Sequence, residues 1–201
     1  MNVFESVGLK VLIVRPGCTE LDDQGRISGT LDLPLSDSGI EQITKMAEEL
    51  SDLSIDKVYA GPGAAAKQTA ELLAGDRKVK VKLEDDLRNL DYGLWHGKRL
   101  DELKETQPKL VKMWQDQPHK ICPPDGETVE DLEGRVQRFV KKLTKKYKTG
   151  SVVVVTAEPV ACVVKSLLED ADISENWTIE ANSGTWDAVV TGDKVASGRL
   201  K

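Results

Sequence analysis

An arginine, a proline and a glycine follow a run of apolar residues near the start of the chain. Val-Leu-Ile-Val at 11–14 leads directly into Arg15, Pro16 and Gly17. A continuous apolar run of this kind predicts a strand buried on both faces of a parallel sheet, and ligands bind beyond the carboxyl ends of such strands. The planar guanidinium of Arg15 suits an anion such as phosphate or carboxylate. Pro16 has no titratable group and no N–H donor, so it can supply neither a nucleophile nor a proton.

Other side chains capable of nucleophilic or proton-transfer chemistry are few. The chain has two histidines, His96 and His119, and we expect both at the surface. Its three cysteines, Cys18, Cys122 and Cys162, are far apart and form neither a metal-ligand spacing nor a disulfide framework. We therefore expect no metal site and no cofactor. Unpaired cysteines also suit a reducing compartment, so we expect a cytoplasmic location.

Cys18 is the one cysteine close to Arg15, and it is a candidate nucleophile. A thiolate phosphatase needs an arginine on a phosphate loop that follows the cysteine closely. Arg26 lies too far along the chain, and the acidic Asp22 and Asp23 intervene. An ordinary loop cysteine is the favoured interpretation. The four tryptophans are expected to pack in the interior rather than to form a ligand cage: Trp95, Trp114, Trp177 and Trp186.

Length and composition indicate a soluble globular protein of one domain. The chain has 201 residues, of which 39% are hydrophobic and 31% charged. A net charge of -6 argues against nucleic acid or an anionic membrane as the main partner. No apolar run approaches the ~20 residues that a membrane span needs. The first eight residues lack the basic start and apolar stretch of a signal peptide.

Alternating strand and helix patterns surround the Arg15 segment. Ser36 predicts the start of a helix, and 56–60, 64–74 and 79–83 predict a strand, a helix and an edge strand. The remaining elements are a helical excursion at about 98–120 broken by Pro108, a helix from Thr128 to about 147, a valine-rich strand at 151–156 central in the sheet beside the first, a helix through Leu168, and closing strands at 177–190. This order predicts a three-layer α/β/α sandwich with a mainly parallel central sheet.

Several short motifs then occur in one order between residues 11 and about 190. After Arg15-Pro16-Gly17 they are Gly-Arg-Ile-Ser-Gly at 25–29, Asp-Leu-Pro-Leu-Ser-Asp-Ser-Gly at 32–39, Tyr-Ala-Gly-Pro-Gly-Ala-Ala-Ala-Lys-Gln-Thr-Ala at 59–70, Leu-Arg-Asn-Leu-Asp-Tyr-Gly-Leu-Trp-His-Gly at 87–97, Pro-Asp-Gly-Glu-Thr at 124–128 and Val-Val-Val-Thr-Ala-Glu at 153–158. This order resembles the histidine phosphatase superfamily, also called phosphoglycerate mutase-like. The resemblance covers nearly the whole chain and implies that fold for residues 1–201 as a single domain.

The chain departs from that family at the positions that carry its chemistry. The resemblance implies a phosphoryl transfer to the histidine of an Arg-His-Gly motif, and Pro16 stands at that position. Ala157 stands at the position of the second histidine, Ala65 at that of a phosphate-clamping arginine and Asn89 at that of the acidic proton donor. These four positions are predicted to lie around one cavity although they span most of the chain.

Of the side chains that the resemblance assigns to the family's chemistry, the cation Arg15 is the one that remains. Glu158 replaces the glycine that follows the family's second histidine, and a pairing of Arg15 with Glu158 or with Asp22 competes with residual anion binding. We expect no catalytic residue. The predicted vestigial pocket contains Arg15, Gly17, Asp22 and Glu158.

The favoured hypothesis is a pseudoenzyme of this superfamily that acts by binding or regulation. Its partner would be an unidentified protein or small ligand, and the sequence does not indicate an oligomeric state. The alternative is a phosphatase or phosphomutase with residual or altered phosphoester activity. Turnover on phosphoesters distinguishes the two.

Overall fold

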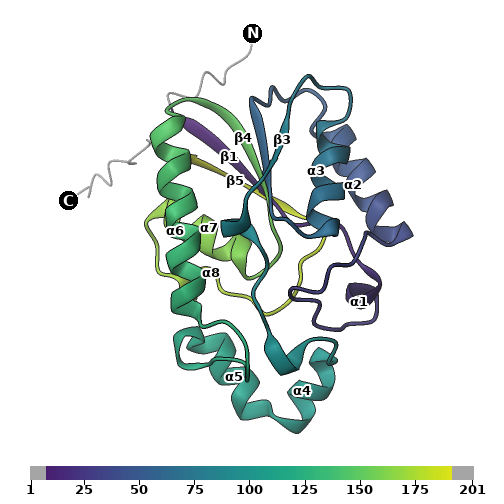
Figure 1. Ribbon diagram of the computed structural model, residues 1–201, viewed down its shortest axis with the longest axis vertical. Helices are drawn as coiled ribbons and strands as arrows, with labels where there is room; N and C mark the ends of the chain where they lie inside the picture. The colour runs from purple at the N-terminus through teal and green to yellow at the C-terminus, as the bar shows by residue number, and fades with distance from the viewer. Residues whose placement is uncertain (1–7, 192–201) are drawn as a thin grey trace, which may run out of the picture.

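A computed structural model describes the protein from residue 8 to residue 191 and has a five-stranded sheet between layers of helices (Figure 1). The strands are β1 (Leu9–Val14), β2 (Lys57–Ala60), β3 (Val81–Leu83), β4 (Gly150–Val155) and β5 (Trp186–Thr191). Their order is β3-β2-β4-β1-β5. The first four pair in parallel, and β5 runs antiparallel to β1. The predicted three-layer sandwich with a mainly parallel sheet is therefore confirmed, as are the central place of β4 beside β1 and the edge position of β3.

Helices cover both faces of this sheet. The helices of the described part are α1 (Glu20–Asp23), α2 (Asp37–Glu49), α3 (Ala64–Ala74), α4 (Leu100–Thr106), α5 (Pro108–Asp116), α6 (Val129–Lys146), α7 (Val160–Glu169) and α8 (Ile173–Asn176), with short 3-10 turns at Asp85–Leu87, Gly93–Trp95 and Pro118–Lys120. Figure 1 shows α2 and α3 on one side of the sheet and α6 and α7 on the other. Within residues 8–191, every helix is too short or too polar to span a bilayer.

The apolar run of β1 is explained by burial on both faces. Leu12 and Val14 belong to the core cluster on the α2 and α3 side, whereas Val11 and Ile13 belong to the cluster on the α6 and α7 side. All four side chains are fully buried. Since successive residues of a strand point to opposite faces, a strand covered on both sides must be apolar throughout.

Several helix boundaries follow from local sequence chemistry. The Ser36 side chain accepts a hydrogen bond from the Gly39 N–H at the start of α2, and Thr128 accepts one from the Asp131 N–H at the start of α6. Pro108 ends one helical segment and begins α5, so the predicted excursion at about 98–120 consists of α4 and α5. The extent of a single domain over 1–201 stays a prediction, and residues 1–7 and 192–201 lie outside the described part.

Two segments differ from expectation. The loop expected at Cys18 leads directly into α1, which begins because the Thr19 hydroxyl accepts the N–H of Asp22. The prediction of several closing strands at 177–190 is wrong, since β5 is the one strand there among the described residues. The edge of the sheet beside β1 accommodates a single antiparallel strand. The preceding residues cross the end of β1 instead, where the Gly184 N–H donates to the Pro16 carbonyl at 2.8 Å.

Candidate functional site

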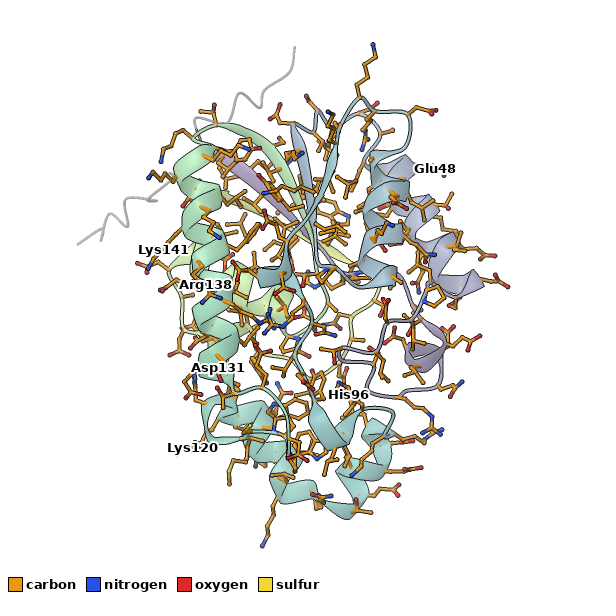
Figure 2. The ribbon with its side chains drawn as sticks, viewed as in Figure 1. Glu48, His96, Lys120, Asp131, Arg138 and Lys141 are labelled. Atoms are coloured by element: carbon orange, nitrogen blue, oxygen red, sulfur yellow. The ribbon has the colours of Figure 1, made fainter. Side chains whose placement is uncertain are left out.

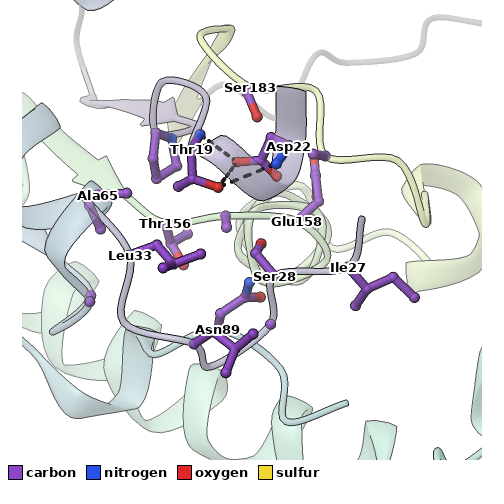
Figure 3. A pocket seen from close by; sticks show the side chains of 18 of the residues that line it. Thr19, Asp22, Ile27, Ser28, Leu33, Ala65, Asn89, Thr156, Glu158 and Ser183 are labelled. Atoms are coloured by element: carbon purple, nitrogen blue, oxygen red, sulfur yellow. Dashed lines mark hydrogen bonds between the residues drawn. The ribbon is translucent and has the colours of Figure 1, made fainter. Parts of the chain in front are cut away.

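A cavity of about 250 Å³ lies beyond the carboxyl ends of β1 and β4 (Figure 3). Pro16 follows β1 and Ala157 follows β4, and both line the cavity. Ala65 reaches it from the first turn of α3, and Asn89 from the segment after the 3-10 turn at Asp85–Leu87. The structure thus brings together these four positions, which the sequence predicted to lie around one cavity. In an open parallel sheet this edge is where ligands bind.

The loop after β1 is held against the start of α2 by two glycines. A Cβ on Gly17 would lie 2.4 Å from the Gly39 carbonyl oxygen, and a Cβ on Gly39 would lie 2.2 Å from the Cys18 carbonyl oxygen. Real Cβ atoms do not approach backbone oxygen this closely, so a larger residue at either position would force the two segments apart. This contact positions Pro16 and Gly17 at the cavity wall.

Arg15 is bound to two carboxylates. Its Nε and one terminal nitrogen each lie 2.8 Å from Glu158 Oε1, and its other terminal nitrogen contacts Asp187. The Glu158 Oε2 atom accepts the backbone N–H of Cys162 at 3.1 Å. Glu158 lines the cavity, whereas Arg15 is not among the lining residues. The cavity therefore meets the carboxylate side of this pair rather than its guanidinium.

Burial and the neighbouring positive charge shift the pKa values of Glu158 and Asp187 in opposite directions. Burial raises the pKa of Glu158 above its ordinary value, although Arg15 and the Cys162 N–H act in the opposite direction. Burial also tends to raise the pKa of Asp187, but the hydrogen bond and positive charge of Arg15 outweigh it and leave the pKa below its ordinary value. Asp187 further lies 3.5 Å from the ammonium of Lys165. The network thus contains two cations and two carboxylates.

The pairing of Arg15 with Glu158 is confirmed, and the alternative pairing with Asp22 is wrong. Asp22 Oδ2 accepts hydrogen bonds at 2.8 Å from both the N–H and the hydroxyl of Thr19. Its carboxylate completes the capping box of α1, which fixes its orientation. Asp22 still lines the cavity, as Gly17 does.

The rest of the cavity wall is mainly apolar, with two arginines among its charged residues. Arg26 donates to the Gly97 carbonyl at 2.7 Å, and Arg88 pairs with Glu127 at 3.1 Å and with Asp85 at 3.3 Å. The apolar lining includes Ile27, Leu31, Leu33, Leu87 and Ile179. Arg88 is thus paired with carboxylates, whereas Arg26 donates only to neutral acceptors, Gly97 and Gln24, and forms no ion pair among the described residues.

A buried arginine of α6 holds the backbone segment that carries Asn89. Arg135 donates to the backbone carbonyls of Asp86, Arg88 and Asn89 at 2.9, 2.7 and 3.2 Å. It also forms a two-pronged pair with Glu127, at 2.7 and 2.9 Å. The guanidinium therefore holds the 86–89 segment in place under the cavity.

No histidine or cysteine is among the residues that line the cavity, although His96 contacts the lining residue Tyr92. His96 Nε2 accepts the backbone N–H groups of Thr30 and Tyr92 at 3.2 and 3.3 Å, and His119 lies near Glu130 and Glu133 on α6. The Sγ of Cys18 accepts a hydrogen bond from Gln42 at 3.4 Å. The described residues 8–191 contain no cluster of three or more histidine, cysteine or carboxylate side chains that could hold a metal ion.

Sequence reasoning did not single out Asp187, Arg135 or the hydroxyl of Tyr92. Asp187 had a usable signal, because it is an acid inside the apolar strand segment Trp-Asp-Ala-Val-Val at 186–190. Arg135 had a weaker one, since it lies on the buried face of α6. Tyr92 occurs in a turn-rich segment, where nothing indicates which way its side chain points.

Several known proteins are similar to this chain in sequence or in structure. The chain is 29% identical to phosphoserine phosphatase 1 of Hydrogenobacter thermophilus over 182 residues, which is 90% of this chain and 86% of the relative. It is 24% identical to adenosylcobalamin/alpha-ribazole phosphatase of Escherichia coli, over 96% of this chain and 95% of the relative. The crystal structure of the alpha-ribazole phosphatase from Shigella flexneri superimposes with a TM-score of 0.75 at 25% identity, covering 89% of each chain.

The family match covers nearly all of the fold described above. Residues 11–197 match the histidine phosphatase superfamily (branch 1), and they include most of β1, all of β4 and the segments that line the cavity. The chain therefore belongs to the histidine phosphatase superfamily, branch 1.

Proposed function

We propose that this protein is a non-catalytic member of the superfamily that acts by binding a ligand or a protein partner. The observation that carries the proposal is the chemical content of the cavity wall. Among the described residues, the lining includes no histidine, cysteine or lysine. The phosphoryl-accepting position is occupied by Pro16 and the position after β4 by Ala157, and neither side chain can form a covalent intermediate.

The hydroxyl groups at the cavity do not replace the missing nucleophile. The Thr19 hydroxyl donates to Asp22, and the Thr156 hydroxyl donates to the Leu87 carbonyl at 2.9 Å. Ser28 and Ser183 also line the cavity, but no histidine lies among the lining residues to act as their base. A serine without an adjacent base is a weak nucleophile near neutral pH.

The electrostatics of the cavity also oppose phosphoryl transfer. That reaction depends on positive charge around the transferred group. Here the buried guanidinium of Arg15 is bound by Glu158 and Asp187. Loss of one charge-stabilising donor typically lowers a rate by about 10²–10³-fold, and loss of general acid catalysis by about 10²–10⁴-fold. We therefore expect no turnover above background, and we expect inorganic phosphate to bind no more tightly than about 1 mM, since a partly exposed ion pair contributes only ~0–1 kcal/mol.

A second candidate function is phosphatase activity of a residual or altered kind. The similarity to known proteins favours this second function, because the three similar proteins described above are all called phosphatases. A cytoplasmic location and a single domain over 1–201 belong to the proposal as sequence-based expectations. The three cysteines are free thiols, which suits a reducing compartment.

Steady-state assays separate the two candidates. We would incubate the full chain with 4-nitrophenyl phosphate, phosphoserine and phosphoglycerate and measure phosphate release. Background rates on all three support the non-catalytic function. A rate that scales with protein concentration, survives repurification and disappears in the Glu158→Gln or Asp22→Asn variant would establish the phosphatase instead.

A further inference from the structure

Tyr92 presents a hydroxyl group that the protein itself leaves unused. Its side chain is 5% exposed and lines the cavity. The ring packs edge-on against Trp114, with centroids 5.4 Å apart, and against His96. Among residues 8–191 no group forms a hydrogen bond with the hydroxyl. The hydroxyl is not among the fully enclosed unpaired atoms of the described residues, so it is accessible to a molecule that can form the missing hydrogen bond. The partner expected here is a ligand in the cavity.

Asn89 offers a second hydrogen-bonding group at the cavity. Its Oδ1 accepts the N–H of Leu90 at 2.7 Å, which fixes the side chain and leaves the amide nitrogen without a partner among the described residues. Figure 3 shows Asn89 and Ser28 on one side of the pocket and Thr19 and Asp22 on the other. An amide nitrogen and a tyrosine hydroxyl together suit a ligand that carries a hydroxyl or carbonyl oxygen.

Most charged groups of the cavity are paired within the protein, and the two that lack an ion pair among the described residues, Asp22 and Arg26, have opposite signs. Glu158 uses Oε1 for Arg15 and Oε2 for the Cys162 N–H. Asp22 is engaged by Thr19, and Glu180 lies 3.2 Å from the ammonium of Lys104. An anionic ligand would meet the Glu158 and Asp22 carboxylates as well as Arg26, and a cationic one would meet Arg26 as well as the carboxylates. This balance favours an uncharged ligand.

We propose that the cavity binds a small uncharged molecule with an apolar body and a hydroxyl or amide group, held by the Tyr92 hydroxyl and the Asn89 amide. Its volume of about 250 Å³ lies just below the ~300–1,000 Å³ of ordinary ligand pockets, so the ligand is small. The apolar side chains of Ile27, Leu33 and Ile179 contact its body. This inference rests on the proposed non-catalytic function, because it assigns the binding chemistry of the same cavity.

Four probes that share one ring test the charge selectivity. Benzyl alcohol and benzamide are uncharged, benzylamine is cationic, and benzyl phosphate is anionic at pH 7. We would titrate each into the full chain and follow the backbone amide signals by NMR. The uncharged probes are expected to shift signals of the lining residues and to bind at least about 5-fold more tightly than either charged probe, a difference of ~1 kcal/mol.

Two tyrosine variants provide a matched comparison. Tyr92→Phe removes the cavity hydroxyl and is expected to weaken binding of the uncharged probes by about 2–10-fold, which is the contribution of one hydrogen bond. Tyr147→Phe removes a hydroxyl that lies 3.4 Å from that of Tyr59, away from the cavity, and is expected to leave binding unchanged. Ala65→Leu fills the cavity from a helix that tolerates leucine and is expected to abolish binding.

The possible results are distinguishable. Tighter binding of benzyl phosphate or benzylamine overturns the ligand class, and so does the absence of any saturable shift at the lining residues. Equal weakening by Tyr92→Phe and Tyr147→Phe overturns the role of the Tyr92 hydroxyl. Release of benzyl alcohol from benzyl phosphate overturns the non-catalytic function instead, and the affinities of benzamide and benzylamine then still test the charge selectivity.

Discussion

Arg15 and Arg135 are both buried, at 7% and 2% exposure, but they are bound by different kinds of acceptor. Arg15 is held by the side chains of Glu158 and Asp187, which come from distant parts of the chain. Arg135 is held by Glu127 and by three backbone carbonyls of the 86–89 segment. Side-chain acceptors can be changed one at a time, whereas backbone carbonyls stay as long as the fold does. Substitutions can therefore replace the acceptors of Arg15, whereas three of the acceptors of Arg135 belong to the backbone of the fold.

The two regions also differ in what lies next to them. Glu158 separates Arg15 from the cavity, so the charge of this arginine is neutralised inside the protein. Arg135 lies under the cavity wall and keeps Asn89 at its place. We infer that changes near Arg15 alter what the cavity binds, whereas changes at Arg135 alter whether the wall forms.

The largest expected effect is a gain of phosphatase activity when the residues around Arg15 are changed. The combined changes Pro16→His, Ala65→Arg, Asn89→Glu, Ala157→His and Glu158→Gly should raise phosphate release from 4-nitrophenyl phosphate by about 10²–10³-fold over the unaltered protein. No single change should suffice, because a nucleophile, a clamp and an acid act as a unit. Colorimetric turnover and detection of phosphohistidine measure the gain. The five-site variant should also unfold more easily than the unaltered protein, because functional sites trade against stability.

A four-change version that keeps Glu158 is the control for this experiment. Because Glu158 holds Arg15, that variant should be clearly less active than the five-change one. A folded five-change variant that binds vanadate but never forms phosphohistidine would contradict the claim that these positions alone account for the missing chemistry.

Arg135→Met should give the largest loss of stability. The change leaves three carbonyls without their donor and leaves Glu127 with Arg88 as its remaining cation, and breaking a buried pair costs about 3–5 kcal/mol of unfolding free energy. Denaturant unfolding measures it. Arg138→Met, three residues along the same helix, removes an exposed arginine (Figure 2) paired with Asp86 and should cost about 0–1 kcal/mol. Equal losses for the two variants would refute the structural role of Arg135.

Arg15→Met should cost less, about 2–3 kcal/mol at pH 7, because Glu158 can take up a proton when its partner is removed. Burial already raises the pKa of Glu158 in the folded protein, and loss of Arg15 raises it further. The folded variant then binds more protons than the unfolded chain, so its deficit relative to the unaltered protein should shrink as the pH falls from 7 to 5. Unfolding curves across that range test the sign, and a deficit that grows towards pH 5 would contradict it.

Lys165→Met is expected to have the smallest effect. Its ammonium lies 3.5 Å from Asp187, and both side chains are partly exposed, so the pair contributes about 0–1 kcal/mol. Asp187 keeps its contact with Arg15 in this variant. Thermal unfolding should therefore shift little, and a loss as large as that of Arg15→Met would mean that the lysine is an equal member of the network.

Much of the fold could be predicted because its signals are local. The bounds predicted for α3, 64–74, agree with the structure, and Ser36 and Thr128 were recognised as helix starts because the hydroxyl acts within its own turn. The closing segment at 177–190 could not be predicted in the same way. Whether it forms one strand or two depends on how much of the sheet edge beside β1 is free, which is a property of the assembled sheet.

The sequence by itself determined which chemistry is present at the ends of β1 and β4. A proline and an alanine stand there, and no fold can make them nucleophiles or bases. Only the tertiary structure decided which groups meet. It paired Arg15 with Asp187 across 172 positions of the chain, assigned Asp22 to a helix cap, and left the Tyr92 hydroxyl without a protein partner at the cavity. Residue types set what a side chain can do, but distances between remote segments exist only once the sheet and its helices have assembled.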